Sequence, residues 1–191
     1  MGRPENGRVM EAYHLVPAPD AARCLVCGLD REHGYNVRFR VDGDTVVGAW
    51  TATAALEGWG GLVHGSAFAA LHDDAAHWAM NVLVGQIGVT TRMDVRFQRP
   101  IRIGDRVTAT GRVASVDARR GAFATEIRHA DGAVASTAVT EYMFVEDPAL
   151  LARLLGRPVS PMAVELLAAP PEKRREMILE RSRRITAAGR A

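Results

Sequence analysis

The sequence has few of the features that mark secreted, membrane or nucleic-acid-binding proteins. Its 191 residues include one lysine, Lys173, and two cysteines, Cys24 and Cys27. No stretch of about 20 residues is free of charge, which argues against a membrane span. Residues 1–6 lack the apolar run of a signal peptide. We therefore expect a cytoplasmic protein that does not associate with membranes.

The charge is nearly balanced, with 24 Lys and Arg against 22 Asp and Glu and a net charge of +2. A net charge this small does not by itself indicate a nucleic-acid partner. The content of 48% hydrophobic and 24% charged residues fits one globular domain with an appendage. We expect a lead-in over 1–33, the domain over 34–146 and a helical C-terminal extension over 147–191.

The two cysteines form a Cys-x-x-Cys pair in the lead-in. Such a pair binds zinc or forms a redox disulfide in many proteins, and His14 and His33 are available as further ligands. The spacing is irregular, however, and the second cysteine pair of a zinc ribbon is missing. We therefore expect buried, reduced thiols and no metal.

A long helix is predicted over 66–84, where the chain has no Pro or Gly and is rich in Ala, Leu and Met. Gly65 or Ser66 begins it, since Ser is a good N-cap residue. At about 100° per residue, one stripe of apolar side chains would face a sheet. Its members are Phe68, Leu71, Ala75, Trp78 and Val82.

The adjacent acids Asp73 and Asp74 are unusual in this helix. Asp73 lies nearly opposite the core stripe, among small apolar side chains, and Asp74 lies nearer the edge of the core. A helix that is apolar nearly all round is usually buried, and a buried acid needs a partner or a function. The alternative, two acids on a solvated face, is equally compatible with the composition.

Six segments have the alternation and the flanking turn residues of β-strands. Among them, 89–97 predicts one buried face made by Val89, Thr91, Met93, Val95 and Phe97. A glycine-rich loop, 57–61, leads into the helix. The expected order is a hairpin, one long helix, and four strands joined by turns, an antiparallel α+β meander against a single helix. The predicted strands are 35–40, 45–53, 89–97, 106–117, 122–129 and 133–145.

Short amphipathic helices are predicted over 148–155 and 161–168, and a longer charged helix over 172–185. The basic clusters 173–175 and 181–184 fit two interpretations. They bind an anionic partner, or they belong to a solvated or oligomer-bracing helix in which acids interleave. We favour the second interpretation.

These motifs together resemble one family. Residues 57–65 read EGWGGLVHG, an acid follows the histidine by nine residues, and 88–93 read GVTTRM. The Cys-x-x-Cys-Gly motif and the stretch FQRPIRIGD at 97–105 fit the same pattern. The combination resembles the PaaI-like acyl-CoA thioesterases over 24–145. It implies a hotdog fold, an antiparallel sheet wrapped around one long central helix.

The resemblance also implies roles for four residues. Asp73 corresponds to the general base or nucleophile, and the backbone N–H of Gly65 to the donor that polarises the thioester carbonyl. Thr90 corresponds to the hydroxyl that positions the attacking water, and His64 to a residue that holds the loop. Since the helix rises about 12 Å from Gly65 to Asp73, one subunit cannot bring them together. We expect a homodimer, or a homotetramer built as a dimer of dimers, with each site shared between subunits.

Further residues are candidates for substrate contacts. Ser66 replaces the second Gly of the family's His-Gly-Gly motif, and Asp74 is either a bystander or a like-charge neighbour that raises the pKa of the catalytic acid. Coenzyme A carries phosphates, so cationic side chains are expected near its path. Coenzyme A is part of the substrate, and no separate cofactor is expected. The remaining candidates are Glu57, Trp59, Arg99, Arg119 and Arg120.

The leading functional prediction is hydrolysis of an acyl-CoA to the free acid and CoA. The main alternative is a non-catalytic hotdog protein that binds acyl-CoA as a sensor or partner subunit. A hotdog hydratase is disfavoured because the sequence has no Asp-x-Asn-Pro-x-His motif.

Overall fold

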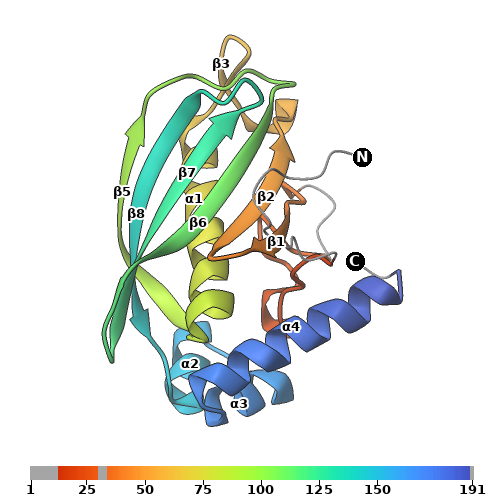
Figure 1. The fold of residues 1–191 in the computed structure, drawn as a ribbon, viewed down its shortest axis with the longest axis vertical. Helices are drawn as coiled ribbons and strands as arrows, with labels where there is room; N and C mark the ends of the chain where they lie inside the picture. Colours follow the sequence, from red (N-terminus) through yellow and green to blue (C-terminus); the bar gives the residue numbers. More distant parts are fainter. Residues whose placement is uncertain (1–12, 30–33, 190–191) are drawn as a thin grey trace.

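A computed structural model describes residues 13–29 and 34–189. A six-stranded antiparallel sheet curls around the helix α1, with strand order β1-β2-β6-β7-β8-β5 (Figure 1). The predicted combination of an antiparallel sheet and one long central helix is confirmed. The strands are β1 (Arg38–Asp42), β2 (Thr45–Thr51), β5 (Gly88–Phe97), β6 (Arg106–Val116), β7 (Arg120–His129) and β8 (Val134–Phe144).

The central helix α1 spans Gly65–Ala79 and continues into a π-helical turn, η3, at Met80–Val84. His64 is its N-cap residue, and Gly85 ends the helical run with a φ of 78°, a left-handed conformation that favours glycine. All five members of the predicted core stripe are buried. Helical periodicity therefore identified residues of α1 that lie in the core.

The predicted meander is wrong in the placement of one strand. β5 pairs with β8 at the far edge of the sheet, whereas β6 pairs with β2 and β7. The helix carries the chain across the sheet, so β5 joins the edge opposite β1, and only β6 to β8 form a meander. The predicted loop 57–61 instead forms the first strand and the turn of a short hairpin, made of β3 (Glu57–Trp59) and β4 (Leu62–Val63).

A β-bulge in β5 changes the face on which its threonines lie. The register with β8 shifts between Thr90 and Arg92, and Thr90 lies opposite the buried Tyr142. Such a bulge adds one residue to a strand and moves the residues before it to the other face. The predicted buried face was therefore wrong at Thr91, because Thr90 faces α1 instead. None of the five residues predicted for that face is buried, and Phe97 at its end is 58% exposed.

Three helices follow the sheet, α2 (Pro148–Leu155), α3 (Pro161–Ala168) and α4 (Pro171–Ala187). α4 packs beside η3, where the buried guanidinium of Arg174 donates to the carbonyls of Leu166 and Leu167 and to Oε1 of Gln86. Arg174 thus belongs to the packing of the extension and not to a basic surface cluster. No helix of the described ranges is long and apolar enough to cross a membrane.

The fully buried side chain of His72 connects α1 to the sheet through hydrogen bonds. Its Nδ1 lies 2.7 Å from Oγ1 of Thr125 on β7, and its Nε2 lies 2.8 Å from Oγ of Ser136 on β8. Burial lowers the pKa of His72 from 6.5 to about 4. The imidazole is therefore neutral in the folded protein at neutral pH.

His72 should make the protein less stable in acid. The unfolded chain binds a proton at His72 below about pH 6.5, whereas the folded chain resists protonation until about pH 4. Stability is therefore lost as the pH falls through this window, by about 3 kcal/mol in total. Urea unfolding between pH 7 and pH 4, for the wild type and His72→Gln, checks this. Equal pH slopes for the two proteins would contradict it.

Candidate active site

Asp73 lies at mid-helix on α1, held by side chains of two neighbouring strands. Its Oδ1 accepts hydrogen bonds from Oγ1 of Thr90 at 2.7 Å and from the hydroxyl of Tyr142 at 2.9 Å. The Tyr142 hydroxyl also lies 2.8 Å from the Asp73 carbonyl oxygen. Among the residues that the structure describes, none donates a hydrogen bond to Oδ2. One carboxylate oxygen is fixed in place and the other is available for chemistry.

Tyr142 is a site residue that the sequence reasoning missed. Burial raises the pKa of Tyr142, and the negative charge of Asp73 adds to the effect, so the phenol keeps its proton and donates. Strand alternation in β8 places Tyr142 on the inner face. That alternation alone did not show that it meets Asp73, which lies 69 residues earlier in the chain.

Asp74 faces away from this arrangement and contacts the Cys-x-x-Cys turn. The Sγ of Cys24 lies 3.3 Å from its Oδ1, and the Sγ of Cys27 lies 3.6 Å from the same oxygen. Burial raises the pKa of Asp74 well above its usual range. The two adjacent acids are therefore in different environments.

The N-terminus of α1 is exposed and capped by His64. The Nδ1 of His64 accepts the N–H of Ser66 at 3.1 Å and lies 2.7 Å from the Ser66 hydroxyl. The first N–H groups of a helix have no partner within the helix, and this cap leaves that of Gly65 unused. Gly58 permits the approach, because a Cβ there would lie 2.9 Å from Cα of His64.

Glu57 and Trp59 belong to the hairpin that precedes α1. Oε1 of Glu57 accepts the N–H of Gly61 at 2.7 Å, so it closes the turn of the hairpin. The side chain of Trp59 is 85% exposed. In the single chain, neither residue lies beside Asp73.

A cavity of about 290 Å³ lies between the Cys-x-x-Cys turn, α1 and the C-terminal helices. Asp73 and Asp74 both line it, and α3 and α4 supply apolar side chains that include Met162, Leu166 and Ile178. A larger hollow of about 550 Å³ on the outer face of the sheet contains none of the predicted catalytic residues. The smaller cavity therefore fits an acyl group beside the candidate acid.

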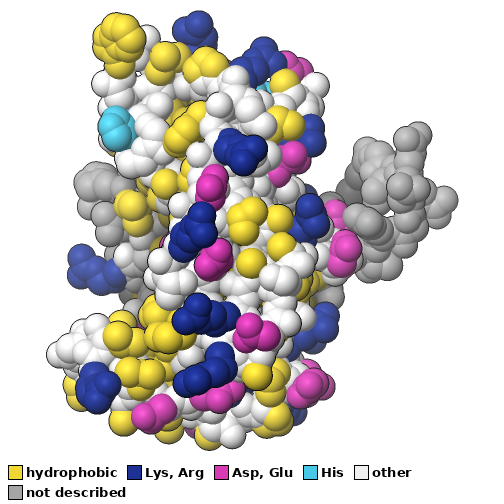
Figure 2. Space-filling model, turned by 90° about the vertical axis from the view of Figure 1, so that its left-hand side faces the viewer, with side chains coloured by type: hydrophobic (Ala, Val, Ile, Leu, Met, Phe, Trp, Pro, Cys, Tyr) yellow, Lys and Arg dark blue, Asp and Glu magenta, His cyan; other side chains and the backbone are white. Residues whose placement is uncertain are grey.

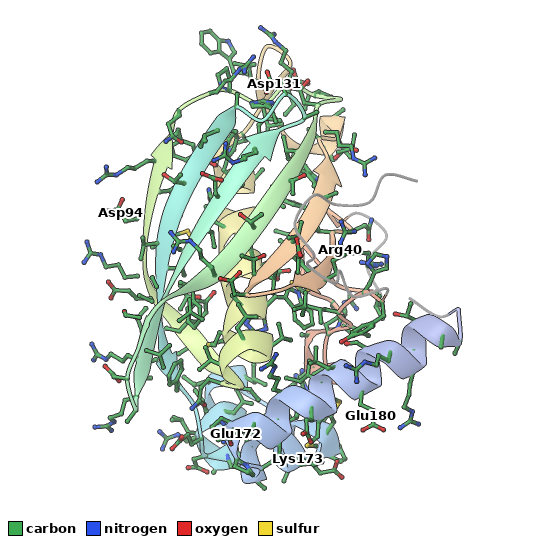
Figure 3. The ribbon with its side chains drawn as sticks, in the orientation of Figure 1. Arg40, Asp94, Asp131, Glu172, Lys173 and Glu180 are labelled. Atoms are coloured by element: carbon green, nitrogen blue, oxygen red, sulfur yellow. The ribbon has the colours of Figure 1, made fainter. Side chains whose placement is uncertain are left out.

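The three candidate arginines for coenzyme A do not come together in one chain. Arg99 forms an ion pair with Asp131 at 2.9 Å, at the end of the sheet where Figure 3 labels Asp131. Arg119 and Arg120 lie at the β6–β7 turn, where Oδ1 of Asp117 accepts both backbone N–H groups. The two groups lie at opposite ends of β7.

Part of the chain matches a known protein family. Residues 60–136 match the family model of the thioesterase superfamily. No curated protein matches the chain. The matched segment covers β4, α1, β5, β6 and β7, the elements that carry the helix N-terminus, Asp73 and Thr90.

Solved structures of similar fold are consistent with the match to the family model. A thioesterase superfamily protein is 32% identical with a TM-score of 0.55, and the match covers 58% of this chain and 55% of that protein. The PaaI protein of the E. coli phenylacetic acid degradation operon is 22% identical (TM-score 0.54; 58% and 80% covered). A hypothetical thioesterase from Streptococcus pneumoniae, solved with coenzyme A, is 18% identical (TM-score 0.51; 53% and 82% covered).

Residues 60–136 thus match the thioesterase superfamily, and the domain has the hotdog fold, with PaaI among its structural neighbours. This confirms the resemblance inferred from the sequence. The chain spans about half the length of the first of these proteins.

Proposed function

We propose that this protein is an acyl-CoA thioesterase whose catalytic acid is Asp73. The observation that carries the proposal is the fixed carboxylate beside an apolar cavity. Thr90 and Tyr142 hold one oxygen of Asp73 at 2.7 and 2.9 Å, and the same residue lines a cavity of about 290 Å³. A positioned carboxylate next to an acyl-sized cavity suits hydrolysis of a thioester.

The oxyanion donor in this proposal is the N–H of Gly65 from a second subunit. A helix N-terminus offers free N–H groups and a favourable dipole to developing negative charge. Gly65 is exposed in the single chain, and the rise along α1 keeps it about 12 Å from Asp73 of the same helix. A partner subunit is therefore required to bring donor and acid to one thioester.

The exposed edge of the sheet supports dimerisation. β5 pairs with β8 on one side only, and its end carries Phe97, which is 58% exposed. Figure 2 shows this side of the molecule, with basic and acidic side chains next to one another and hydrophobic side chains around them. A long unpaired edge strand is a ready site for pairing with another chain. We propose the edge of β5 as the dimer contact.

The proposed reaction uses water and leaves free CoA. With Asp73 as general base, a water proton passes to its carboxylate while the water oxygen bonds to the acyl carbon. The carbonyl oxygen becomes an oxyanion held by Gly65 of the partner. When the carbonyl re-forms, the carbon–sulfur bond breaks, and the CoA thiolate takes up the proton from Asp73. With Asp73 as nucleophile, its carboxylate bonds to the acyl carbon while the carbon–sulfur bond breaks and CoA leaves as the thiolate. Water then cleaves the resulting anhydride, which releases the free acid and restores the Asp73 carboxylate, and the water proton passes to the thiolate.

The proposal is tested by measuring thiol release from short, aromatic and long acyl-CoAs, together with the oligomeric state on dilution. We expect hydrolysis of at least one acyl class, and loss of activity in parallel with dissociation of the dimer. Tight acyl-CoA binding without any thiol release would instead identify a non-catalytic binding protein. Full activity of a monomer would contradict the shared site.

A further inference from the structure

We infer that Cys24, Cys27 and Asp74 form a binding site for a divalent transition metal of the zinc class. The two sulfurs and one carboxylate oxygen of these residues lie within 4.8 Å of one another. Because the sequence places Asp74 about 50 residues from the cysteines, only the fold shows this third ligand. The site does not depend on the proposed thioesterase activity.

The turn around the cysteines has the form of a metal-binding loop. The N–H of Val26 points to Sγ of Cys24 at 3.5 Å. Gly28 donates to the Cys24 carbonyl at 3.1 Å, and a Cβ at Gly28 would lie 2.5 Å from that oxygen. Backbone N–H groups directed at a sulfur stabilise a thiolate, the form in which cysteine binds metals.

Asp74 lacks the partners that a buried carboxylate needs. Asp74 is only 7% exposed, and its Oδ2 has no hydrogen-bond partner within residues 13–29 and 34–189. Among the described residues, its Oδ1 accepts hydrogen bonds only from the two cysteine sulfurs, which are weak donors. An unpaired buried acid is costly, whereas a bound cation would balance its charge.

The two sulfur-to-oxygen distances fit tetrahedral coordination. Bonds of about 2.3 Å to sulfur and 2.0–2.2 Å to oxygen place a sulfur and an oxygen roughly 3.5–3.7 Å apart in a tetrahedron. The two sulfur-to-oxygen distances in the structure are 3.3 and 3.6 Å. Two thiolates and a carboxylate suit zinc and exclude magnesium and calcium, which prefer oxygen ligands only.

The fourth coordination position opens toward the cavity. All three ligand residues line it, together with Trp78, whose buried indole N–H has no acceptor in the described part of the chain. Three protein ligands and an open position characterise metal sites that hold a water or a ligand. Metal binding would also fix the Cys-x-x-Cys turn to α1 at the wall of this cavity.

Metal content and cobalt spectroscopy test the site. The full-length protein, prepared without a histidine tag or chelator, should contain about one zinc ion per chain. After removal of the metal, addition of Co²⁺ alone should give the thiolate-to-cobalt charge-transfer absorption of a sulfur-ligated ion. Cys24→Ala and Asp74→Asn should weaken binding by roughly 100-fold or more, since even supporting residues contribute 10- to 100-fold.

Asp73→Asn is the matched control, because it changes the neighbouring acid outside the cluster. It should keep its zinc while losing the proposed activity, which separates this inference from the proposed function. Circular dichroism of each variant shows whether the fold is retained. The inference is overturned if the wild type holds no more metal than Cys24→Ala and gives no charge-transfer band. A Cys24–Cys27 disulfide in the purified protein, with no metal uptake after reduction, also overturns it.

Discussion

Asp73→Asn is expected to lower kcat for acyl-CoA hydrolysis by about 10³-fold, within the range for loss of a general acid or base. Asn has nearly the same shape, and its carbonyl oxygen still accepts the hydrogen bonds from Thr90 and Tyr142. The variant should therefore fold and bind acyl-CoA with little change. Steady-state thiol release together with acyl-CoA binding by calorimetry checks both parts.

The neighbouring Asp74→Asn variant decides whether the assignment on the helix is correct. Asp74 contacts the cysteines and makes no hydrogen bond to Thr90 or Tyr142. Its substitution should preserve more activity than Asp73→Asn. An inactive Asp74→Asn beside an active Asp73→Asn would show that the catalytic acid is assigned one residue too early.

Gly65→Pro should lower kcat by about 10²- to 10³-fold, the usual effect of removing one oxyanion donor. Proline lacks the N–H but is favoured at the first position of a helix. The preceding His64 has φ −63° and ψ 140°, a conformation that suits a residue before proline. Gly65→Ala keeps the N–H and is the control, since its Cβ would lie 3.7 Å from Phe97, an ordinary contact. Equal loss in both variants would point to a steric effect and not to the donor.

Mixing Asp73→Asn with Gly65→Pro tests whether the site is shared. If each site takes Gly65 from one subunit and Asp73 from the other, a mixed dimer contains one intact site and one site with both defects. Random reassembly should then restore about a quarter of wild-type activity, because half of the dimers are mixed and half of their sites are intact. If both residues came from one subunit, mixing would restore nothing.

Periodicity in the sequence predicted the local elements well. The core stripe of α1 and most strand positions follow from the alternation of apolar and polar residues, which reflects the geometry of each element alone. The position of β5 in the sheet does not follow from this alternation, because the strand order depends on where the chain leaves α1. The bulge beside Thr90 is likewise a property of the pairing with β8.

The candidate site was predictable only where a motif marked it. His64, Gly65 and Asp73 lie within ten residues of one another, and the resemblance of this motif to the PaaI-like thioesterases implied their roles. Tyr142 and the cysteine partners of Asp74 come from distant segments, and a contact between distant segments requires the tertiary structure. The two acids also show the limit of prediction from sequence. Helical spacing placed them on different faces of the helix, but it did not indicate which residues each one contacts.

In the proposed site, the C-terminal helices line the space for the acyl group without contributing the catalytic acid. The family match ends at residue 136, yet α3 and α4, which line the cavity beside Asp73, begin at Pro161 and Pro171. Substitutions in Met162, Leu166 or Ile178 would reshape the space for the acyl chain while leaving the carboxylate and its two hydroxyl donors in place. In the proposed thioesterase, chain-length preference would thus be set by residues outside the matched segment 60–136.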